Sequence, residues 1–153
     1  MTGLASVMIY TDGACRPNPG PGGWAAILKY QDRERILTGA ETQATNNRME
    51  LTAAIRALQA LKHPCQVDLY TDSEYLRRGI TEWLPVWRQR DWRRKEGALA
   101  NRELWQALDA ALAPHQVRWH WVKGHSRDVL NQRVDRLARE AIPAWNGAIS
   151  KIS

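Results

Sequence analysis

The chain has 153 residues, of which 44% are hydrophobic, and we expect one domain over residues 1–153 with a flexible tail from about residue 143. Because no apolar run approaches the roughly 20 residues that a bilayer-spanning helix needs, and no signal-peptide pattern opens the chain, we expect a cytoplasmic protein without membrane contact. The net charge of +6 argues against an acidic protein or a neutral metabolite as the partner and favours nucleic acid.

The first half of the chain is predicted to form three strands and then a helix. The strands are expected over Ser6–Thr11, Gly22–Tyr30 and Arg33–Thr38, with a polar turn between the last two. Apolar residues then recur at helical spacing from Asn46 to Lys62, and Thr45 or Asn46 is available to cap this helix.

The second half alternates strands and helices. A short strand is expected over Gln66–Thr71, and one or two short helices over Glu74–Trp87, broken near Gly79 and Pro85. The remaining predicted elements are a loop or exposed extension over Arg88–Ala100, a helix over Arg102–Leu112, a strand over Gln116–Val122 and a helix over Asn131–Ile142.

This order of elements predicts an α/β fold with a mixed five-stranded sheet and helices on both faces. The crossover through the Asn46–Lys62 helix makes the Ser6–Thr11 and Gln66–Thr71 strands plausible parallel neighbours. No helix has a spare apolar face that suggests an oligomer, so we expect a monomer.

Four acidic residues lie in contexts that folding alone does not require. Asp12 and Asp72 each follow an apolar strand, in Tyr-Thr-Asp-Gly and Tyr-Thr-Asp-Ser. If these strands are parallel neighbours, both carboxylates emerge at the carboxyl end of the sheet, where open α/β sheets bind ligands. Glu50 and Asp135 lie on the apolar stripes of their helices, which turns them toward the protein. Four gathered acids would repel one another unless they share a cation.

Each acid also has a structural interpretation. Asp12 precedes a glycine, as turn residues do, Asp72 could cap a helix, and Glu50 complements the dipole of a helix start. The set of four favours a metal site. Oxygen ligands without histidine or cysteine pairs at zinc spacing select a hard cation, so we expect Mg²⁺, with Mn²⁺ as a substitute.

Such a site would suit phosphodiester hydrolysis. Two cations about 4 Å apart could activate a water and stabilise the leaving oxygen. His125, in a polar loop after Lys-Gly, could shuttle a proton or help the product leave, because its charge changes near neutrality. A merely exposed loop histidine is the alternative interpretation.

Basic and aromatic residues are concentrated between Arg77 and Lys95, a segment with seven basic residues and only two acidic ones. Trp83 and Trp87 are four residues apart on a short predicted helix, and both could stack on bases or sugars while arginines grip phosphates. Binding by such a groove should weaken steeply with salt. Packing of both tryptophans in the core is an equally good interpretation.

Taken together, these segments resemble the type 1 ribonuclease H family, of the bacterial kind, from about Val7 to Ala141. Five ordered segments carry the resemblance: Tyr-Thr-Asp-Gly-Ala-Cys with Asn-Pro-Gly-Pro-Gly-Gly-Trp after it, Thr-Asn-Asn-Arg-Met-Glu-Leu, Thr-Asp-Ser-Glu-Tyr, Trp-Val-Lys-Gly-His and Val-Asp-Arg-Leu-Ala. The resemblance implies a ribonuclease H-like fold and an endonuclease that hydrolyses the RNA strand of RNA/DNA hybrids.

The resemblance also implies a role for particular residues. It places the metal-binding acids at Asp12, Glu50, Asp72 and Asp135 and the catalytic histidine at His125. It places Asn46, Asn47 and Glu74 near RNA 2′-hydroxyls, and Cys15 and Asn18 beside the substrate groove. A phosphate of the DNA strand would bind Thr45, Arg48 and Asn101. The same strand would pass through a channel formed by Trp83 and Trp87. Such contacts distinguish a strand with 2′-hydroxyls from one without them.

Two segments depart from the family pattern. Ser126–Gln132 replaces a loop of Gly, His and Pro after the catalytic histidine, and Lys95–Ala100 is shorter and less charged than the usual basic extension. A catalytically impaired hybrid-binding module is therefore the alternative function, and a related nuclease acting on DNA is a third. The intact set of acids argues against the first alternative. The Asn46-Asn47 pair and the tryptophan channel argue against the second.

Overall fold

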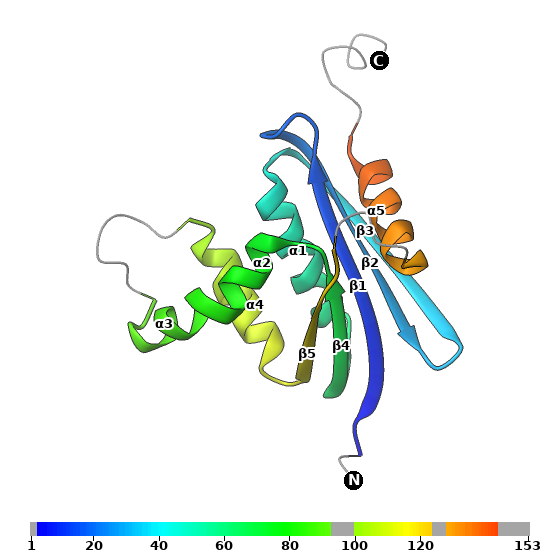
Figure 1. The fold of residues 1–153 in the computed structure, drawn as a ribbon, viewed down its shortest axis with the longest axis vertical. Helices are drawn as coiled ribbons and strands as arrows, with labels where there is room; N and C mark the ends of the chain where they lie inside the picture. Colours follow the sequence, from blue (N-terminus) through cyan, green and yellow to red (C-terminus); the bar gives the residue numbers. More distant parts are fainter. Residues whose placement is uncertain (1–2, 93–99, 124–127, 144–153) are drawn as a thin grey trace.

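One mixed five-stranded sheet, in the order β3-β2-β1-β4-β5, organises the computed structural model, which describes residues 3–92, 100–123 and 128–143 (Figure 1). The strands β1 (Ala5–Cys15), β2 (Gly20–Tyr30) and β3 (Arg33–Ala44) form an antiparallel meander. The strands β4 (Cys65–Thr71) and β5 (Gln116–Trp121) run parallel to β1. The prediction that the first and fourth strands are parallel neighbours is confirmed.

The strand β1 is longer than predicted at its carboxyl end. Asp12 and Gly13, which resemble a turn in the sequence, pair with Ala25 and Trp24 of β2. The ladder continues to the pair of Cys15 and Gly22. Backbone hydrogen bonds to a long partner strand hold this segment extended, so Asp12 lies within the strand and not beyond its end.

Helices cover both faces of the sheet (Figure 1). On one face lies α1 (Asn46–Gln59), which provides the crossover between β3 and β4, with α4 (Arg102–Leu112) packed beside it. On the other face lies α5 (Val129–Ala141), which contacts β1 and β2. The helix α1 ends three residues before the predicted Lys62, and Pro64 follows closely, consistent with the rule that residues before a proline disfavour helix.

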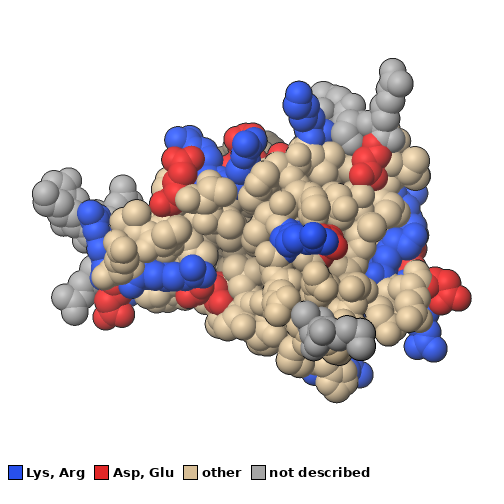
Figure 2. Space-filling model, turned by 60° about the horizontal axis from the view of Figure 1, so that its bottom comes forward, with Lys and Arg blue, Asp and Glu red and all other residues tan. Residues whose placement is uncertain are grey.

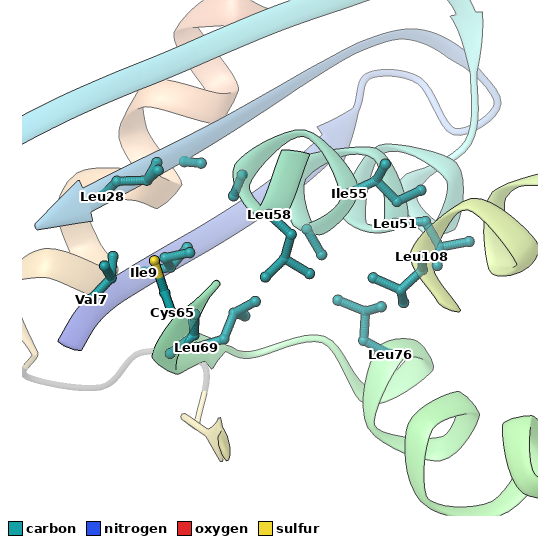
Figure 3. Close-up of a cluster of buried hydrophobic side chains, with 14 of the residues drawn as sticks. Val7, Ile9, Leu28, Leu51, Ile55, Leu58, Cys65, Leu69, Leu76 and Leu108 are labelled. Atoms are coloured by element: carbon teal, nitrogen blue, oxygen red, sulfur yellow. The ribbon is translucent and has the colours of Figure 1, made fainter. Parts of the chain in front are cut away.

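Each face has its own hydrophobic cluster. The larger one joins the inner side chains of β1 and β4 to α1 and α4, with Ile9, Leu58, Leu69 and Leu108 among its fully buried members (Figure 3). The smaller one lies under α5 and contains Tyr10, Ala25, Ile27, Val134 and Ala138. The part of the sheet formed by β1 and β2 is therefore buried on both faces.

The segment from Glu74 to Gln89 stays helical where we predicted breaks. It consists of α2 (Glu74–Arg78), a π-helical turn (Gly79–Trp83) and α3 (Leu84–Gln89). A Cβ on Gly79 would collide with the ring of Trp105, so glycine here permits a close approach and does not end the helix. Pro85 lies in the first turn of α3, directly after the π-helical turn, so the helical path continues although Pro85 has no amide hydrogen to donate.

None of the helices in the described part of the chain is both long enough and apolar enough to cross a membrane.

Candidate active site

Asp12 and Asp72 come from the two neighbouring parallel strands. Tyr10 of β1 pairs with Tyr70 of β4, and each aspartate stands two residues further along its own strand direction. Asp12 is buried, with 7% of its surface exposed, and Asp72 is half-buried just after β4 ends at Thr71. The parallel pairing therefore brings the two carboxylates to one place.

Glu50 reaches the same place from the first turns of α1. The helix begins after Thr45, whose side chain accepts a hydrogen bond of 3.1 Å from the Arg48 amide. The carboxylate of Glu50 forms a hydrogen bond with Ser73. Its other oxygen, Oε2, is buried and has no hydrogen-bond partner among the residues that the structure describes. A buried carboxylate oxygen without a partner is costly, so it marks a position where a positive ligand would be favourable.

Asp135 approaches from the opposite side, on α5. It lies close enough to Asp12 for a hydrogen bond between their side chains to contribute to the raised pKa of Asp12. Its side chain is 46% exposed and pairs with Arg139 at 3.0 Å. The sequence predicted that Asp135 lies on the inner side of its helix, and the structure places it at the boundary between the sheet and solvent.

The electrostatics of these acids show that they share one environment. Burial, then the charge of Asp72, then Asp135 and Glu50 raise the pKa of Asp12 to about 9. Burial and the charge of Asp72 raise the pKa of Glu50 to about 7, against the hydrogen bond with Ser73. Burial and the charge of Asp135 raise the pKa of Asp72. Each carboxylate thus disfavours the charged state of its neighbours.

The donor set fits a hard divalent cation. All four candidate ligands are carboxylates, and one of them has the unpartnered buried oxygen of Glu50. Across residues 3–92, 100–123 and 128–143, no three His, Cys, Asp or Glu side chains are arranged tightly enough to hold an ion as they stand.

The predicted catalytic histidine, His125, lies outside the described residues, and so do the basic residues Arg93, Arg94 and Lys95.

Three of the predicted substrate-binding residues are joined by hydrogen bonds. The Cys15 amide donates to Oδ1 of Asn46 at 2.7 Å. The Asn46 amide in turn donates to Oδ1 of Asn18 at 3.1 Å. The end of β1, the loop after it and the first residue of α1 are therefore held together beside Asp12, with the Asn47 side chain exposed next to them.

Arg48 lies on the outer side of this region. Its Nε donates to Oε1 of Glu41 on β3 at 2.7 Å, and both side chains are partly exposed. This ion pair fixes the direction of the guanidinium group beside Thr45. Thr45 and Arg48, which the family resemblance assigns to a DNA phosphate, thus lie at one helix terminus, where amide hydrogens also favour an anion.

A recess of about 280 Å³ opens beside Asp72, and sequence reasoning missed it. Glu74 lines it, as do two basic residues, Arg77 and Lys123, and the aromatic ring of Trp121. Arg77 is within 3.7 Å of Glu74. The strand β5 and the helix α2 are distant in the chain, so no spacing in the sequence could have revealed this shared wall.

Trp83 and Trp87 are half-buried and belong to an aromatic cluster. Their ring centroids are 5.8 Å apart, and both rings contact Trp105 of the core. The Tyr75 hydroxyl binds this cluster to Asn101, since it accepts hydrogen bonds of 3.0 Å from both the Asn101 amide group and the Trp105 indole. The two open interpretations of Trp83 and Trp87 are therefore compatible: each packs partly against the core and keeps part of its surface exposed.

Three of the four described basic residues of this region have acidic partners. Arg77 lies near Glu74, Arg78 near Glu82, and Arg88 binds Asp109 of α4. Figure 2 shows the same mixture, with Lys and Arg side chains lying beside Asp and Glu side chains over the visible face. The positive charge of the described surface is thus less concentrated than the sequence suggested.

A sheet of this order, with carboxylates gathered where its parallel pair β1 and β4 ends, is the architecture of the ribonuclease H-like nucleases. The model of the RNase H family matches residues 5–143. The chain therefore belongs to the RNase H family and is a nuclease of the hydrolase class.

Known relatives and structures agree. The ribonuclease H of Bradyrhizobium diazoefficiens is 60% identical over 143 residues, which is 93% of each chain. That of Xanthomonas campestris pv. campestris is 53% identical over 96% of this chain and 99% of the relative. The crystal structure of LC9-RNase H1, described as a type 1 RNase H with the type 2 active-site motif, has a TM-score of 0.84 and 33% identity, covering 93% of this chain and 74% of that one.

A more distant structure is similar to this chain in fold alone. LC11-RNase H1, solved in complex with an RNA/DNA hybrid, has a TM-score of 0.69 and 23% identity, covering 89% of this chain and 96% of that one.

Proposed function

We propose that this protein is an endoribonuclease that hydrolyses the RNA strand of RNA/DNA hybrids, acting as a cytoplasmic monomer of one domain. The observation that carries the proposal is the approach of Asp12, Glu50 and Asp72 to one another, with a buried oxygen of Glu50 left without a partner in the described structure. Membership of the RNase H family supports the same conclusion.

The four acids Asp12, Glu50, Asp72 and Asp135 would hold Mg²⁺, with Mn²⁺ as a substitute. When bound, two such ions supply an activated water and charge stabilisation at the leaving oxygen. The protein's own contribution is to hold the carboxylates on rigid elements: Asp12 on β1, Asp72 directly after β4, and Glu50 and Asp135 on helices packed against the sheet. The raised pKa values of Asp12, Glu50 and Asp72 support this role, because a bound cation would favour their charged state.

Recognition of the hybrid would use the two sides of the site. Asn46, Asn47 and Glu74 would contact RNA 2′-hydroxyls, with Cys15 and Asn18 lining the groove beside them. The DNA strand would place a phosphate at Thr45, Arg48 and Asn101. Its sugars and bases would pass along the exposed parts of Trp83 and Trp87. His125 would move a proton or assist product release.

The test is cleavage of an end-labelled RNA strand presented as RNA/DNA hybrid, RNA duplex or single strand, in Mg²⁺, Mn²⁺ or EDTA. We expect internal cuts that occur only in the hybrid and only with a divalent cation. Tight hybrid binding without cuts would instead support the hybrid-binding module, and metal-dependent cuts in a DNA duplex would support a nuclease of different substrate class.

A further inference from the structure

Tyr10 and Asp128 join the sheet to α5 next to the acidic centre. The Tyr10 hydroxyl donates a hydrogen bond of 2.6 Å to Oδ2 of Asp128. The other carboxylate oxygen, Oδ1, accepts from the amides of Leu130 at 3.0 Å and Asn131 at 3.3 Å, and so caps the first turn of α5. One carboxylate therefore both begins the helix and binds it to β1.

The contact between Tyr10 and Asp128 lies next to the contact between Asp12 and Asp135 on the same two elements. Side chains two apart on a strand share a face, so Tyr10 and Asp12 both face α5. Asp128 caps the start of α5 and Asp135 lies about two turns further along the same helix, and each side chain approaches a residue of β1. The Tyr10–Asp128 pair and the Asp12–Asp135 pair are thus successive contacts between one strand and one helix.

The two contacts have opposite electrostatic character. The first joins a hydroxyl donor to a carboxylate acceptor, which is attractive. The second brings two carboxylates together beside Asp72 and Glu50, which is repulsive when both are charged. The hydrogen bond from Tyr10 therefore offsets a force that would move α5 away from the acidic centre.

The Tyr10 ring is itself held in a fixed direction. It stacks on Tyr70 with ring centroids 4.5 Å apart, and Tyr70 stacks on His120 at 4.3 Å. These rings occupy paired positions on β1, β4 and β5. Nε2 of His120 lies 2.7 Å from Oδ1 of Asp68, which fixes the far end of the stack. Tyr10 is buried, so its hydroxyl has little freedom to leave Asp128.

We propose that Tyr10 and Asp128 are positioning residues, whose hydrogen bond sets where α5 holds Asp135 relative to Asp12 and thereby sets the cation affinity and the cleavage rate of the site. This inference rests on the proposed function. Both residues act through Asp135 and not on the substrate.

The experiment compares five variants of the full chain, one of them a control. Tyr10→Phe keeps the stacked ring and loses the donor. Asp128→Ser keeps a helix cap but is too short to reach Tyr10 as well. The double variant combines the two changes, and Asp128→Asn keeps both the cap and a polar group that can bond to the Tyr10 hydroxyl. Tyr30→Phe, at the exposed end of β2, is the matched control for loss of a tyrosine hydroxyl.

Four quantities are measured for each variant: the Mn²⁺ affinity of the free protein by calorimetry, kcat and KM on the hybrid, and the unfolding temperature. We expect Tyr10→Phe and Asp128→Ser each to lose about tenfold in Mn²⁺ affinity and kcat, as removal of a group that orients a metal ligand does. KM should stay near that of the unchanged protein. The Mn²⁺ affinity and kcat of the double variant should be no lower than those of the more impaired single variant, because both changes remove the same hydrogen bond. Asp128→Asn and Tyr30→Phe should stay close to the unchanged protein.

Several results would overturn the inference. Unchanged Mn²⁺ affinity in Tyr10→Phe would do so, even with a lower unfolding temperature, because that is the result of a purely structural role. Additive losses in the double variant would also do so. If Asp128→Ser does not fold, Tyr10→Phe and Asp128→Asn still decide the question. If the unchanged protein binds Mn²⁺ but does not cut hybrids, the proposed function fails while the calorimetric comparison still tests the positioning role.

Discussion

Gly13 of β1 lies directly against the backbone of Glu50 on α1. A Cβ built on Gly13 would fall 2.6 Å from the Glu50 amide nitrogen and 2.7 Å from Cβ of Met49, closer than real Cβ atoms approach other groups. The missing side chain thus sets the distance between the helix that carries Glu50 and the strand that carries Asp12.

Gly13→Ala should therefore move Glu50 away from Asp12. We expect a loss of about 1–3 kcal/mol in the free energy of unfolding, as for other overpacked cores, together with a large fall in kcat. Gly39→Ala is the matched control, because its new methyl group would collide with the ring of Trp24 on β2, a strand that carries none of the four acids. Denaturant unfolding and hybrid cleavage measure the two effects. A similar loss of kcat in both variants would mean that the Gly13 contact has no special relation to the site.

Asp72→Asn should abolish cleavage and leave hybrid binding largely intact. The change removes one of the charged ligands that we propose for the cation, so cleavage should fall by at least about 100-fold, more than the loss usual for a group that merely orients a ligand. Single-turnover cleavage and a binding titration on the same hybrid check the two parts. Substantial residual activity in Mg²⁺ would refute the metal role of Asp72.

Stability without metal should fall as the pH rises. The folded-state pKa of Asp12 is about 9, against an ordinary value of 3.8, so the folded protein binds more protons than the unfolded chain between about pH 4 and pH 9. Glu50, with a pKa of about 7, adds to this effect in the lower part of the window. The free energy of unfolding in EDTA is therefore expected to decrease through this range.

Two comparisons test that expectation. Mg²⁺ or Mn²⁺ should stabilise the protein more at pH 9 than at pH 5, because binding requires the charged carboxylates. Asp12→Asn in EDTA at pH 9 should be more stable than the unchanged protein by at least about 1 kcal/mol, the equivalent of roughly one pKa unit. A pH-independent stability in EDTA would contradict the raised pKa of Asp12.

Thr45 should matter for stability and for DNA contact. Its hydroxyl caps α1 by accepting from the Arg48 amide, so Thr45→Val should cost about 1 kcal/mol of stability. If the same hydroxyl meets a DNA phosphate, hybrid binding should weaken further in the folded variant. Thr45→Ser keeps the hydroxyl and is the control. Equal hybrid affinity for Thr45→Val and Thr45→Ser would place the phosphate elsewhere.

The sequence predicted the order of strands and helices because alternation and helical periodicity report burial directly. The extent of β1 was missed because Asp12 and Gly13 are common in turns, whereas the hydrogen bonds that keep them extended come from β2 and depend little on side-chain type. The same limitation hid the continuity of α2 and α3: Gly79 suggests a break by its residue type, but here it makes room for Trp105.

The candidate site was predictable where a motif lies next to a strand end and less so where distant elements meet. Asp12 and Asp72 followed from the parallel pairing of their strands. The half-exposed position of Asp135 did not, because a helical stripe gives a direction but not a depth. The bond from Tyr10 to Asp128 joins residues at nearly opposite ends of the described chain. No spacing in the sequence could reveal it.

The acidic centre also has a consequence for how the protein is made. Asp12 lies near the start of the chain and Asp135 near its end, yet they meet between β1 and α5. A ribosome must therefore synthesise every element from β1 to α5 before the last acid can dock, and we expect these long-range contacts to form late in folding. A growing chain that contains only β1 to β4 lacks that fourth acid, so under the proposed function we expect a nascent chain to gain its cleavage activity only once α5 has been synthesised.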